Sequence, residues 1–226
     1  MLLFIQTLMA MSSCTSQPGP LTTQLHPGIY QVNNQYFYSE PVRTYLIELE
    51  DKLLLFDIPR YSEELKAVIL DFEKPVFAIL SHGSCGIADG SKWQETIGLK
   101  VYAHKADEDH PWIRMRPGVL FTSVPHFADN IEVIHTPGHS AGSICVLEKT
   151  SGSLFTGDTF YADGTGNVRD FTQERQSDYE NLEERIRSCY KLLDYDFENV
   201  YPFHYEVITG NAKNRLSVFL KDLESR

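Results

Sequence analysis

The sequence predicts an α/β sandwich that forms one domain. Three observations support this fold class: a globular composition, an opening series of β-rich runs, and a later alternation of strand and helix patterns. With 226 residues, 42% hydrophobic and 23% charged, the chain has the size and balance of one large soluble domain. No long linker divides it. The predicted organisation is a flexible N-terminal segment over residues 1–24 and a domain over residues 25–226.

The first part of the domain is predicted to be an antiparallel meander, because short β-rich runs alternate with turn residues. These runs are Gly28–Val32, Tyr36–Tyr38, Thr44–Glu48 and Lys52–Asp57. A helix is expected to follow Ser62, since acidic residues stand in its first turn. Leu65, Ile69 and Phe72 would mark the buried face of this helix.

The remaining chain alternates between strands and helices, in two loosely similar β-then-α halves. Further strands are predicted at Val76–Leu80, Leu99–Ala103, Ile131–His135, Ser143–Leu147, Ser153–Thr156 and Glu198–Pro202. Helices are predicted at Asp89–Ile97, after the Ser177–Glu180 segment, and at Ala212–Leu223. Ser177 and Glu180 have the spacing of a capping box, in which both side chains bind free backbone donors at a helix start.

The four cysteines and the N-terminal residues are used to predict the cellular compartment of the protein. No Cys-x-x-Cys pair occurs, which is typical of free thiols in a reducing compartment and predicts a cytoplasmic protein. The apolar run Leu2–Met11, followed by Ser-Ser-Cys14, resembles the hydrophobic region and lipobox of a bacterial lipoprotein signal. It lacks the positive start of a signal peptide and is too short to span a membrane. A disordered extension or an upstream start codon is therefore preferred, and an N-terminal lipid anchor is the one membrane attachment left open.

The charge pattern argues against a nucleic-acid partner. The formal net charge is −11, and the Lys and Arg residues form no basic run. Proteins that bind nucleic acid normally present a basic surface to the phosphates. We therefore expect a small-molecule substrate.

Four candidate metal ligands follow predicted strands: His82, His139, Asp158 and His204. Side chains at the trailing ends of several strands in one α/β sandwich converge on one rim. A catalytic zinc ion needs about three imidazole or carboxylate ligands and one open position for water. A single such histidine is more often an ordinary core or surface residue. Four ligands in the same structural context predict a metal centre.

Two segments carry a resemblance to a known family. His135-Thr-Pro-Gly-His-Ser-Ala-Gly-Ser143 and Leu154-Phe-Thr-Gly-Asp-Thr-Phe160 are similar to the third ligand motif and the bridging-carboxylate motif of the metallo-β-lactamase superfamily. Tyr201-Pro-Phe-His204 stands where the last metal-binding histidine is expected, and Leu53–Asp57 resembles the early strand with its Asp, although Pro59 replaces a usual Gly. The resemblance implies a four-layer αββα sandwich with two mixed sheets.

The first motif of the family departs from its pattern here. The family reads His-x-His-x-Asp-His, whereas this chain reads His82-Gly-Ser-Cys-Gly-Ile87, so only His82 is retained. Cys85 and Asp89 are the candidates to fill the gap, since thiolate and carboxylate both bind zinc. The alternatives are that Asp89 caps the following helix and that Cys85 is a small loop residue.

The resemblance implies a metal-dependent hydrolase, similar to hydroxyacylglutathione hydrolases, that cleaves an ester, thioester or lactam-type bond through a metal-bound hydroxide. The expected cofactor is one or two zinc ions, with iron or manganese as alternatives. Asp158 or Asp89 would accept the proton. A non-catalytic protein that binds one metal ion is the alternative function.

Other residues near the motifs receive weaker assignments. His135 is expected to orient His139, and His104 to be structural. His110 and His126 stand in a Pro-containing loop that could line a substrate pocket. Candidate substrate contacts are Tyr161, Arg169 and Tyr205.

Overall fold

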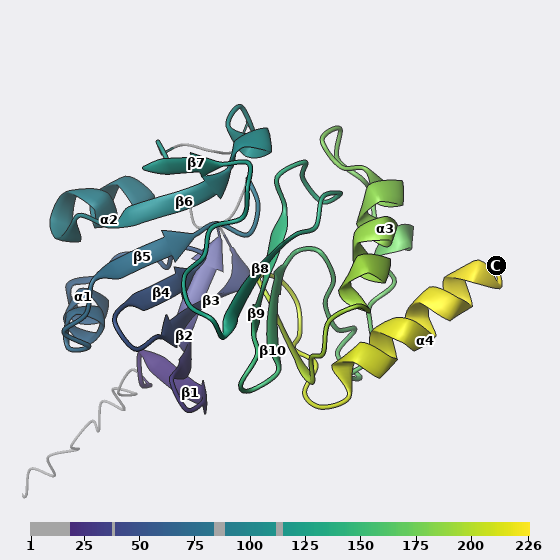
Figure 1. Ribbon diagram of the computed structural model, residues 1–226, viewed down its shortest axis with the longest axis horizontal. Helices are drawn as coiled ribbons and strands as arrows, with labels where there is room; N and C mark the ends of the chain where they lie inside the picture. Colours follow the sequence, from purple (N-terminus) through teal and green to yellow (C-terminus); the bar gives the residue numbers. More distant parts are fainter. Residues whose placement is uncertain (1–18, 38, 84–88, 112–114) are drawn as a thin grey trace, which may run out of the picture.

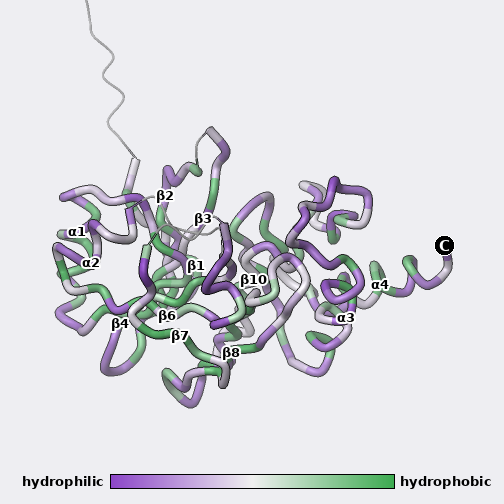
Figure 2. Tube along the Cα trace, turned by 90° about the horizontal axis from the view of Figure 1, so that it is seen from above, coloured by the Kyte–Doolittle hydropathy of each residue, from purple (hydrophilic) through white to green (hydrophobic). Residues whose placement is uncertain are grey.

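The computed structural model describes residues 19–37, 39–83, 89–111 and 115–226. Two β-sheets pack face to face, and a pair of helices covers the outer face of each sheet (Figure 1). The predicted four-layer αββα sandwich is confirmed. In Figure 2, hydrophobic residues gather along the central strands and hydrophilic segments lie at the periphery, as expected for a core between layers.

The larger sheet has seven strands in sequential order. They are β1 (Thr22–His26), β2 (Ile29–Phe37), β3 (Glu40–Glu48), β4 (Leu53–Phe56), β5 (Val76–Ile79), β6 (Lys100–His104) and β7 (Val119–Phe121). Strands β1 to β4 pair antiparallel, and β4 to β7 pair parallel. The parallel part needs crossover connections, and helices α1 (Glu63–Leu70) and α2 (Gly90–Ile97) supply two of them.

The smaller sheet has four strands in the order β11-β10-β9-β8. Their bounds are β8 (Ile131–His135), β9 (Ile144–Glu148), β10 (Ser153–Gly157) and β11 (Asn199–Pro202). Strands β10 and β11 are parallel and are connected through helix α3 (Leu182–Leu192), whereas the other pairs are antiparallel. Helix α4 (Ala212–Glu224) follows β11, and short 3₁₀ turns lie at Lys105–Asp107 (η1) and Phe171–Gln173 (η2).

Three hydrophobic clusters separate the four layers. The central cluster joins the inner faces of both sheets and contains the aromatic residues Tyr45, Phe56, Phe155 and Tyr201. The other two lie between the larger sheet and α1 and α2, and between the smaller sheet and α3 and α4. Tyr45 is fully buried, and its hydroxyl donates to the Pro202 carbonyl of β11 over 2.8 Å. This bond ties the two sheets together beside the end of β11.

Several elements differ from the sequence-based expectations. Strand β1 begins at Thr22, inside the segment predicted to be flexible, because Thr22 pairs with Val32 of β2. Strand β7 has no counterpart among the predicted strands. Helix α3 begins at Leu182 with Asn181 as its N-cap, so the predicted capping box at Ser177 forms a separate turn that precedes the helix. Among the described residues, no helix is long and apolar enough to cross a membrane. Residues 1–18, with the lipobox-like segment, lie outside the described part.

Candidate metal centre

The four predicted ligands lie past the carboxyl ends of four strands, at one end of the sandwich. His82 follows β5 of the larger sheet, whereas His139, Asp158 and His204 follow β8, β10 and β11 of the smaller sheet. The two sheets are joined here by a backbone hydrogen bond from Ile144 N to Ser81 O, 2.8 Å long. The site therefore forms where the rims of the two sheets meet.

Three of these side chains converge on one point. His82 Nε2 lies 3.4 Å from Asp158 Oδ2, and His139 Nε2 lies 3.5 Å from the same oxygen. One ligand atom from each of the three residues lies within 4.8 Å of the other two, and within the described ranges this is the group able to hold a metal ion. Two ligand atoms at tetrahedral angles, about 2.0–2.1 Å from a shared zinc ion, lie roughly 3.3 Å apart. The observed separations fit that requirement.

His204 contacts the same carboxylate. Its Nδ1 lies 2.8 Å from Asp158 Oδ2, and its backbone N–H donates to Asp158 Oδ1 over 3.1 Å. Asp158 is buried, which raises the pKa of its carboxyl, but the neighbouring His204 and His82 outweigh burial and hold that pKa well below its usual range. Burial lowers the pKa of His204, yet the charge and hydrogen bond of Asp158 raise it above that of ordinary imidazole. Asp158 is thus an anionic centre ringed by three imidazoles.

The orientation of His82 is fixed by residues on the larger sheet. Ser81 Oγ lies 2.7 Å from His82 Nδ1, and Ser81 N donates to Asp57 Oδ1 over 2.7 Å. Burial, together with the nearby imidazoles, holds the pKa of His82 well below its usual value despite the opposing charge of Asp158. The neutral ring presents Nε2 toward Asp158. The early-strand Asp of the sequence motif therefore supports the His82 loop.

His139 is held from two sides. Its Nδ1 lies 2.7 Å from Glu180 Oε1, on the turn before α3. On the other side, the buried carboxylate of Asp107 accepts Ser140 Oγ over 2.6 Å and Gly142 N over 2.7 Å. Burial raises the pKa of Glu180, but the hydrogen bonds with His139 and Ser177 N bring it below the usual value. A carboxylate on Nδ1 fixes the ring tautomer and leaves Nε2 free as a ligand.

Loss of the Glu180 carboxylate should weaken metal binding, although Glu180 is not itself one of the proposed ligands. Outer partners of ligating histidines typically contribute 10- to 100-fold to metal affinity. We expect Glu180→Leu to lower affinity by about 10- to 100-fold and Glu180→Gln by less, because an amide oxygen can still accept from Nδ1. Competition with a chelator of known affinity measures both. Glu183→Leu is the control, since Glu183 lies on the exposed face of α3; an equal loss there would contradict the assignment.

Asp89, the other predicted ligand that the structure describes, does not join this cluster. Asp89 Oδ2 accepts the backbone N–H of Tyr61 over 2.9 Å and lies 3.5 Å from Arg60 Nε. Asp89 occupies the N-cap position of α2, yet its side chain makes no capping hydrogen bond. It joins the start of α2 to the segment before α1. Cys85 lies outside the described residues.

The histidines with weaker sequence assignments do not all lie where the sequence predicts. The His135 ring is directed away from the expected partner His139: its Nε2 lies 2.9 Å from Ala141 O, and the ring stacks on His104 at 4.1 Å. Glu180 takes the orienting position that the sequence predicts for His135. His110 packs against Tyr179 at a ring separation of 4.5 Å, whereas His126 is largely exposed.

Glu180 and Asp107 support the site, although the sequence does not mark either as functional. The sequence places Glu180 in a capping box, and the proximity of that motif to a helix start is the only signal available. No sequence motif indicates a role for Asp107, because its contacts with the loop of His139 are made from the other sheet and depend on the tertiary structure.

A hollow of about 260 Å³ opens beside the ligands. The Tyr161 and Tyr205 side chains predicted as substrate contacts line it, and Arg169 stacks over the Tyr205 ring at 4.3 Å. The full lining consists of Phe37, Glu40, His139, Asp158, Tyr161, Glu174, Tyr179, Glu180, Arg185, His204 and Tyr205. A small aromatic and polar pocket next to a ligand cluster is the usual form of a substrate site.

The stability of the metal-free protein should depend on pH through His204. A raised folded-state pKa means that the His204–Asp158 pair contributes fully below pH 6.5, the usual imidazole value, and is lost as pH rises through the raised pKa. After the metal has been removed with a chelator, the free energy of unfolding of the wild-type protein below pH 6.5 is expected to exceed that of His204→Asn by about 1 kcal/mol. Urea unfolding of both proteins across this range measures the difference. A difference that stays constant with pH would contradict the expected protonation of His204.

Comparison with known proteins finds similar sequences and similar folds. The model of the metallo-beta-lactamase superfamily matches residues 92–196. The chain is 34% identical over 79 residues to the beta-lactamase-like protein 2 homolog of Drosophila melanogaster, which covers 35% of this chain and 23% of that protein. It is 36% identical over 89 residues to acyl-coenzyme A thioesterase MBLAC2 of Homo sapiens, which covers 38% and 30%. The matches thus span less than a third of the length of these two relatives.

Solved structures share most or nearly all of this fold. A metallo-beta-lactamase from Pontibacter korlensis superposes with a TM-score of 0.70 at 18% identity, over 91% of this chain and 99% of that one. The protein TTHA1623, in a di-iron-bound form, gives a TM-score of 0.61 at 22% identity, over 74% and 89%. The similarity in fold and the match of the family model agree. The chain has the metallo-β-lactamase fold, and its residues 92–196 are similar in sequence to the metallo-beta-lactamase superfamily.

Proposed function

We propose that this protein is a metal-dependent hydrolase that cleaves an ester, thioester or lactam-type bond, with zinc as its ion. The observation that carries the proposal is the convergence of His82 Nε2 and His139 Nε2 on Asp158 Oδ2 at 3.4 and 3.5 Å. Three ligands with one open position are the pattern of a catalytic zinc site. The relative named as an acyl-coenzyme A thioesterase supports the thioester as a test substrate.

Each residue of the site would have its own role in the proposed hydrolysis. A bound zinc ion supplies Lewis acidity and lowers the pKa of a water molecule toward neutrality. His82 and His139 would hold the ion, since Ser81 and Glu180 fix their Nδ1 atoms and direct Nε2 inward. Asp158 would complete the site and accept the proton of the attacking water. His204 donates its backbone N–H to Asp158 Oδ1 and so fixes the plane of that carboxylate.

A protein that only binds one metal ion is the second candidate. The observation in its favour is the altered first motif, in which Ser84, Gly86 and Ile87 replace the usual ligands. The surviving donors are sufficient for one ion, and Asp89 lies outside their cluster. The proposed hydrolase therefore works with a single ion.

Metal content and turnover separate the two functions. Elemental analysis of the purified full chain, with His139→Ala as control, should give about one ion per chain in wild type and a large loss in the variant. Hydrolysis of ester, thioester and lactam substrates is then measured with zinc, iron and manganese in turn. Turnover that depends on the ion supports the hydrolase. Full occupancy without turnover would leave the binding function, and absence of metal from wild type under all loading conditions would refute both.

A further inference from the structure

Helix α3 lies against the loop that carries one of the candidate ligands. At its start, Asn181 N donates to the Gly138 carbonyl over 2.7 Å, and further along the helix Ser188 Oγ donates to the Pro137 carbonyl over 2.7 Å. These two carbonyls belong to the residues that directly precede His139. The helix therefore holds the backbone of this loop next to the ligand.

Arg185 of the same helix reaches a second ligand loop. Its Nε donates to the Thr159 carbonyl over 2.9 Å, and its Nη2 donates to the Asp158 carbonyl over 2.7 Å. A guanidinium is planar, and its N–H donors point in fixed directions. One side chain thus fixes two successive carbonyl groups, and the first of them belongs to a candidate ligand.

The Arg185 side chain is buried although it carries a positive charge. The residue is 2% exposed, and its guanidinium carbon lies 4.2 Å from the centroid of the Phe171 ring. Within the described part of the chain, no carboxylate forms an ion pair with this guanidinium, and the two carbonyls above accept its hydrogen bonds. A buried cation is unfavourable unless its partners replace the lost hydration. An apolar side chain would fill the same space at a lower cost, so the bonds to the ligand loop account for an arginine here.

The position of the Asp158 carboxylate depends on this backbone. Its Oδ2 lies 3.4 Å from His82 Nε2 and 3.5 Å from His139 Nε2, and its Oδ1 accepts the His204 backbone N–H over 3.1 Å. Ligand distances at a metal site vary by only about 0.2 Å. A small rotation of the peptide group between Asp158 and Thr159 would therefore carry Oδ2 away from the two imidazoles.

We propose that Arg185 is a positioning residue of the metal centre, which fixes the backbone of Asp158 so that its carboxylate meets His82 and His139. The role rests on the proposed function, because it takes Asp158 as a ligand. Arg185 acts through Asp158 and not as a ligand itself, since a guanidinium has no acceptor atom for an ion. The fixed carboxylate is also a property of the metal-free chain and can be measured there.

Arg185 could instead serve only to attach α3 to the rest of the domain. The two roles give different results. A residue that only stabilises the fold changes the free energy of unfolding and leaves the site of the folded molecules unchanged. A positioning residue changes the site in molecules that remain folded, because the carboxylate loses its fixed backbone.

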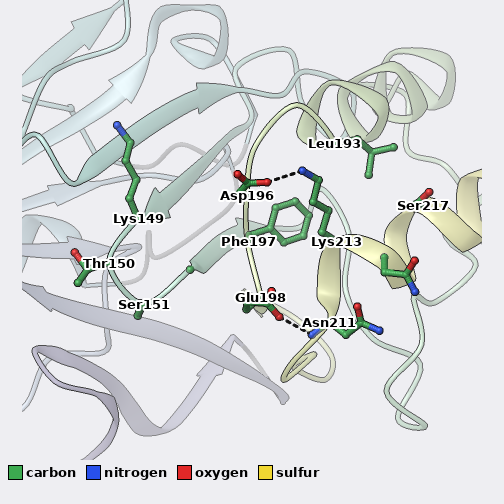
Figure 3. Close-up of a pocket in the computed structure, with 12 residues that line it drawn as sticks. Lys149, Thr150, Ser151, Leu193, Asp196, Phe197, Glu198, Asn211, Lys213 and Ser217 are labelled. Atoms are coloured by element: carbon green, nitrogen blue, oxygen red, sulfur yellow. Dashed lines mark hydrogen bonds and ion pairs between the residues drawn. The ribbon is translucent and has the colours of Figure 1, made fainter.

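A larger hollow at the other end of the smaller sheet carries no comparable inference. It has a volume of about 690 Å³ and lies at the amino ends of β10 and β11 (Figure 3). Its charged groups bind within the protein: Lys213 pairs with Asp196 at 2.8 Å, and Glu198 accepts the Asn211 backbone N–H at 3.0 Å. The described ligand cluster lies past the carboxyl ends of these strands, away from this hollow.

The first test observes the carboxylate in the metal-free protein. Arg185→Lys keeps the charge, but a single ammonium group cannot reproduce the fixed pair of donors. Because His204 Nδ1 lies 2.8 Å from Asp158 Oδ2, the nitrogen NMR shifts of the His204 ring, measured through its carbon-bound protons at one pH, report the carboxylate position. We expect these shifts to change in Arg185→Lys and to stay in Arg187→Lys, the same change at a side chain that is 61% exposed on α3. Unchanged shifts in folded Arg185→Lys would overturn the proposal.

The second test measures metal binding. Zinc affinity of the full chain is determined by competition with a chelator, and the visible absorption spectrum is recorded after full loading with cobalt(II), which reports the arrangement of the ligands. Outer residues that orient ligands contribute about 10- to 100-fold to metal affinity, so we expect Arg185→Lys to lose that much and to alter the spectrum. Arg187→Lys should keep both. A lower free energy of unfolding in Arg185→Lys, with wild-type affinity and spectrum, would assign Arg185 to stability alone.

The two tests separate this proposal from the proposed function. If the wild-type protein holds no metal under any loading condition, the hydrolase is refuted, and the His204 shifts alone decide the role of Arg185. Should Arg185→Lys not fold, Phe171→Leu takes its place, because it removes the ring face that supports the guanidinium and keeps both donors. The same change of the His204 shifts is then expected, and its absence would overturn the proposal.

Discussion

Replacement of Asp158 by Asn is expected to remove metal binding and, with it, hydrolysis. The Asp158 carboxylate is buried, and His82, His139 and His204 all approach its Oδ2 atom within 3.5 Å. An amide keeps the shape but loses the negative charge that balances a divalent ion. Because outer-partner changes already cost 10- to 100-fold in metal affinity, loss of this ligand should cost at least about 100-fold.

Competition with a chelator and metal analysis after dialysis measure this effect. Asp71→Asn provides the same change of charge at an exposed position beyond α1. Circular dichroism establishes that both variants are folded. A folded Asp158→Asn protein with wild-type metal affinity would show that the ion is held elsewhere, and would remove the basis of the proposed function.

The second large effect is expected at Gly138, next to the ligand His139. Its φ is +138°, and a Cβ placed there would lie 2.2 Å from Arg185 N and 2.3 Å from Arg185 Cα. These are backbone atoms of helix α3, which cannot move aside as a flexible side chain can. Gly138→Ala should therefore cost about 4 kcal/mol or more in unfolding free energy, and it should displace His139 from the ligand cluster.

A second glycine separates the contact from the backbone strain. Gly164 has a φ of +89°, but a Cβ added there would meet no atom within 4 Å. Gly164→Ala should cost only about 1 kcal/mol, the cost of the left-handed conformation alone. Chemical denaturation of both variants gives the comparison. Similar costs at the two positions would show that close packing of the ligand loop on α3 contributes little.

The sequence predicts the positions of the candidate ligands better than it predicts the residues that support them. His82, His139, Asp158 and His204 each follow a strand, and the rule that strand ends share a rim brings them together without knowledge of sheet order. The αββα layers follow from the family resemblance combined with the alternation of strands and helices. These features depend on local patterns that are visible in a single sequence.

The supporting residues depend on tertiary contacts that local patterns do not encode. Glu180 has the spacing of a capping box, but Asn181 caps α3, and the Glu180 carboxylate binds His139 instead. Asp107 crosses from the larger sheet to Ser140 and Gly142 of the smaller one. Asp89 is a candidate ligand or helix cap by its position in the sequence, and its carboxylate binds the Tyr61 backbone. In each case a polar side chain meets a partner that lies beyond the reach of the local pattern.

The ligand set draws on both sheets, and this has a thermodynamic consequence. His82 follows a strand of the seven-stranded sheet, whereas His139 and Asp158 follow strands of the four-stranded sheet. An ion held by His82, His139 and Asp158 would connect the two sheets of the sandwich. Its binding free energy would then add to the cohesion of the whole domain, by about 2.7 kcal/mol at a free ion concentration one hundred times Kd. Depletion of the ion would therefore lower the free energy of unfolding of the whole domain by the same amount.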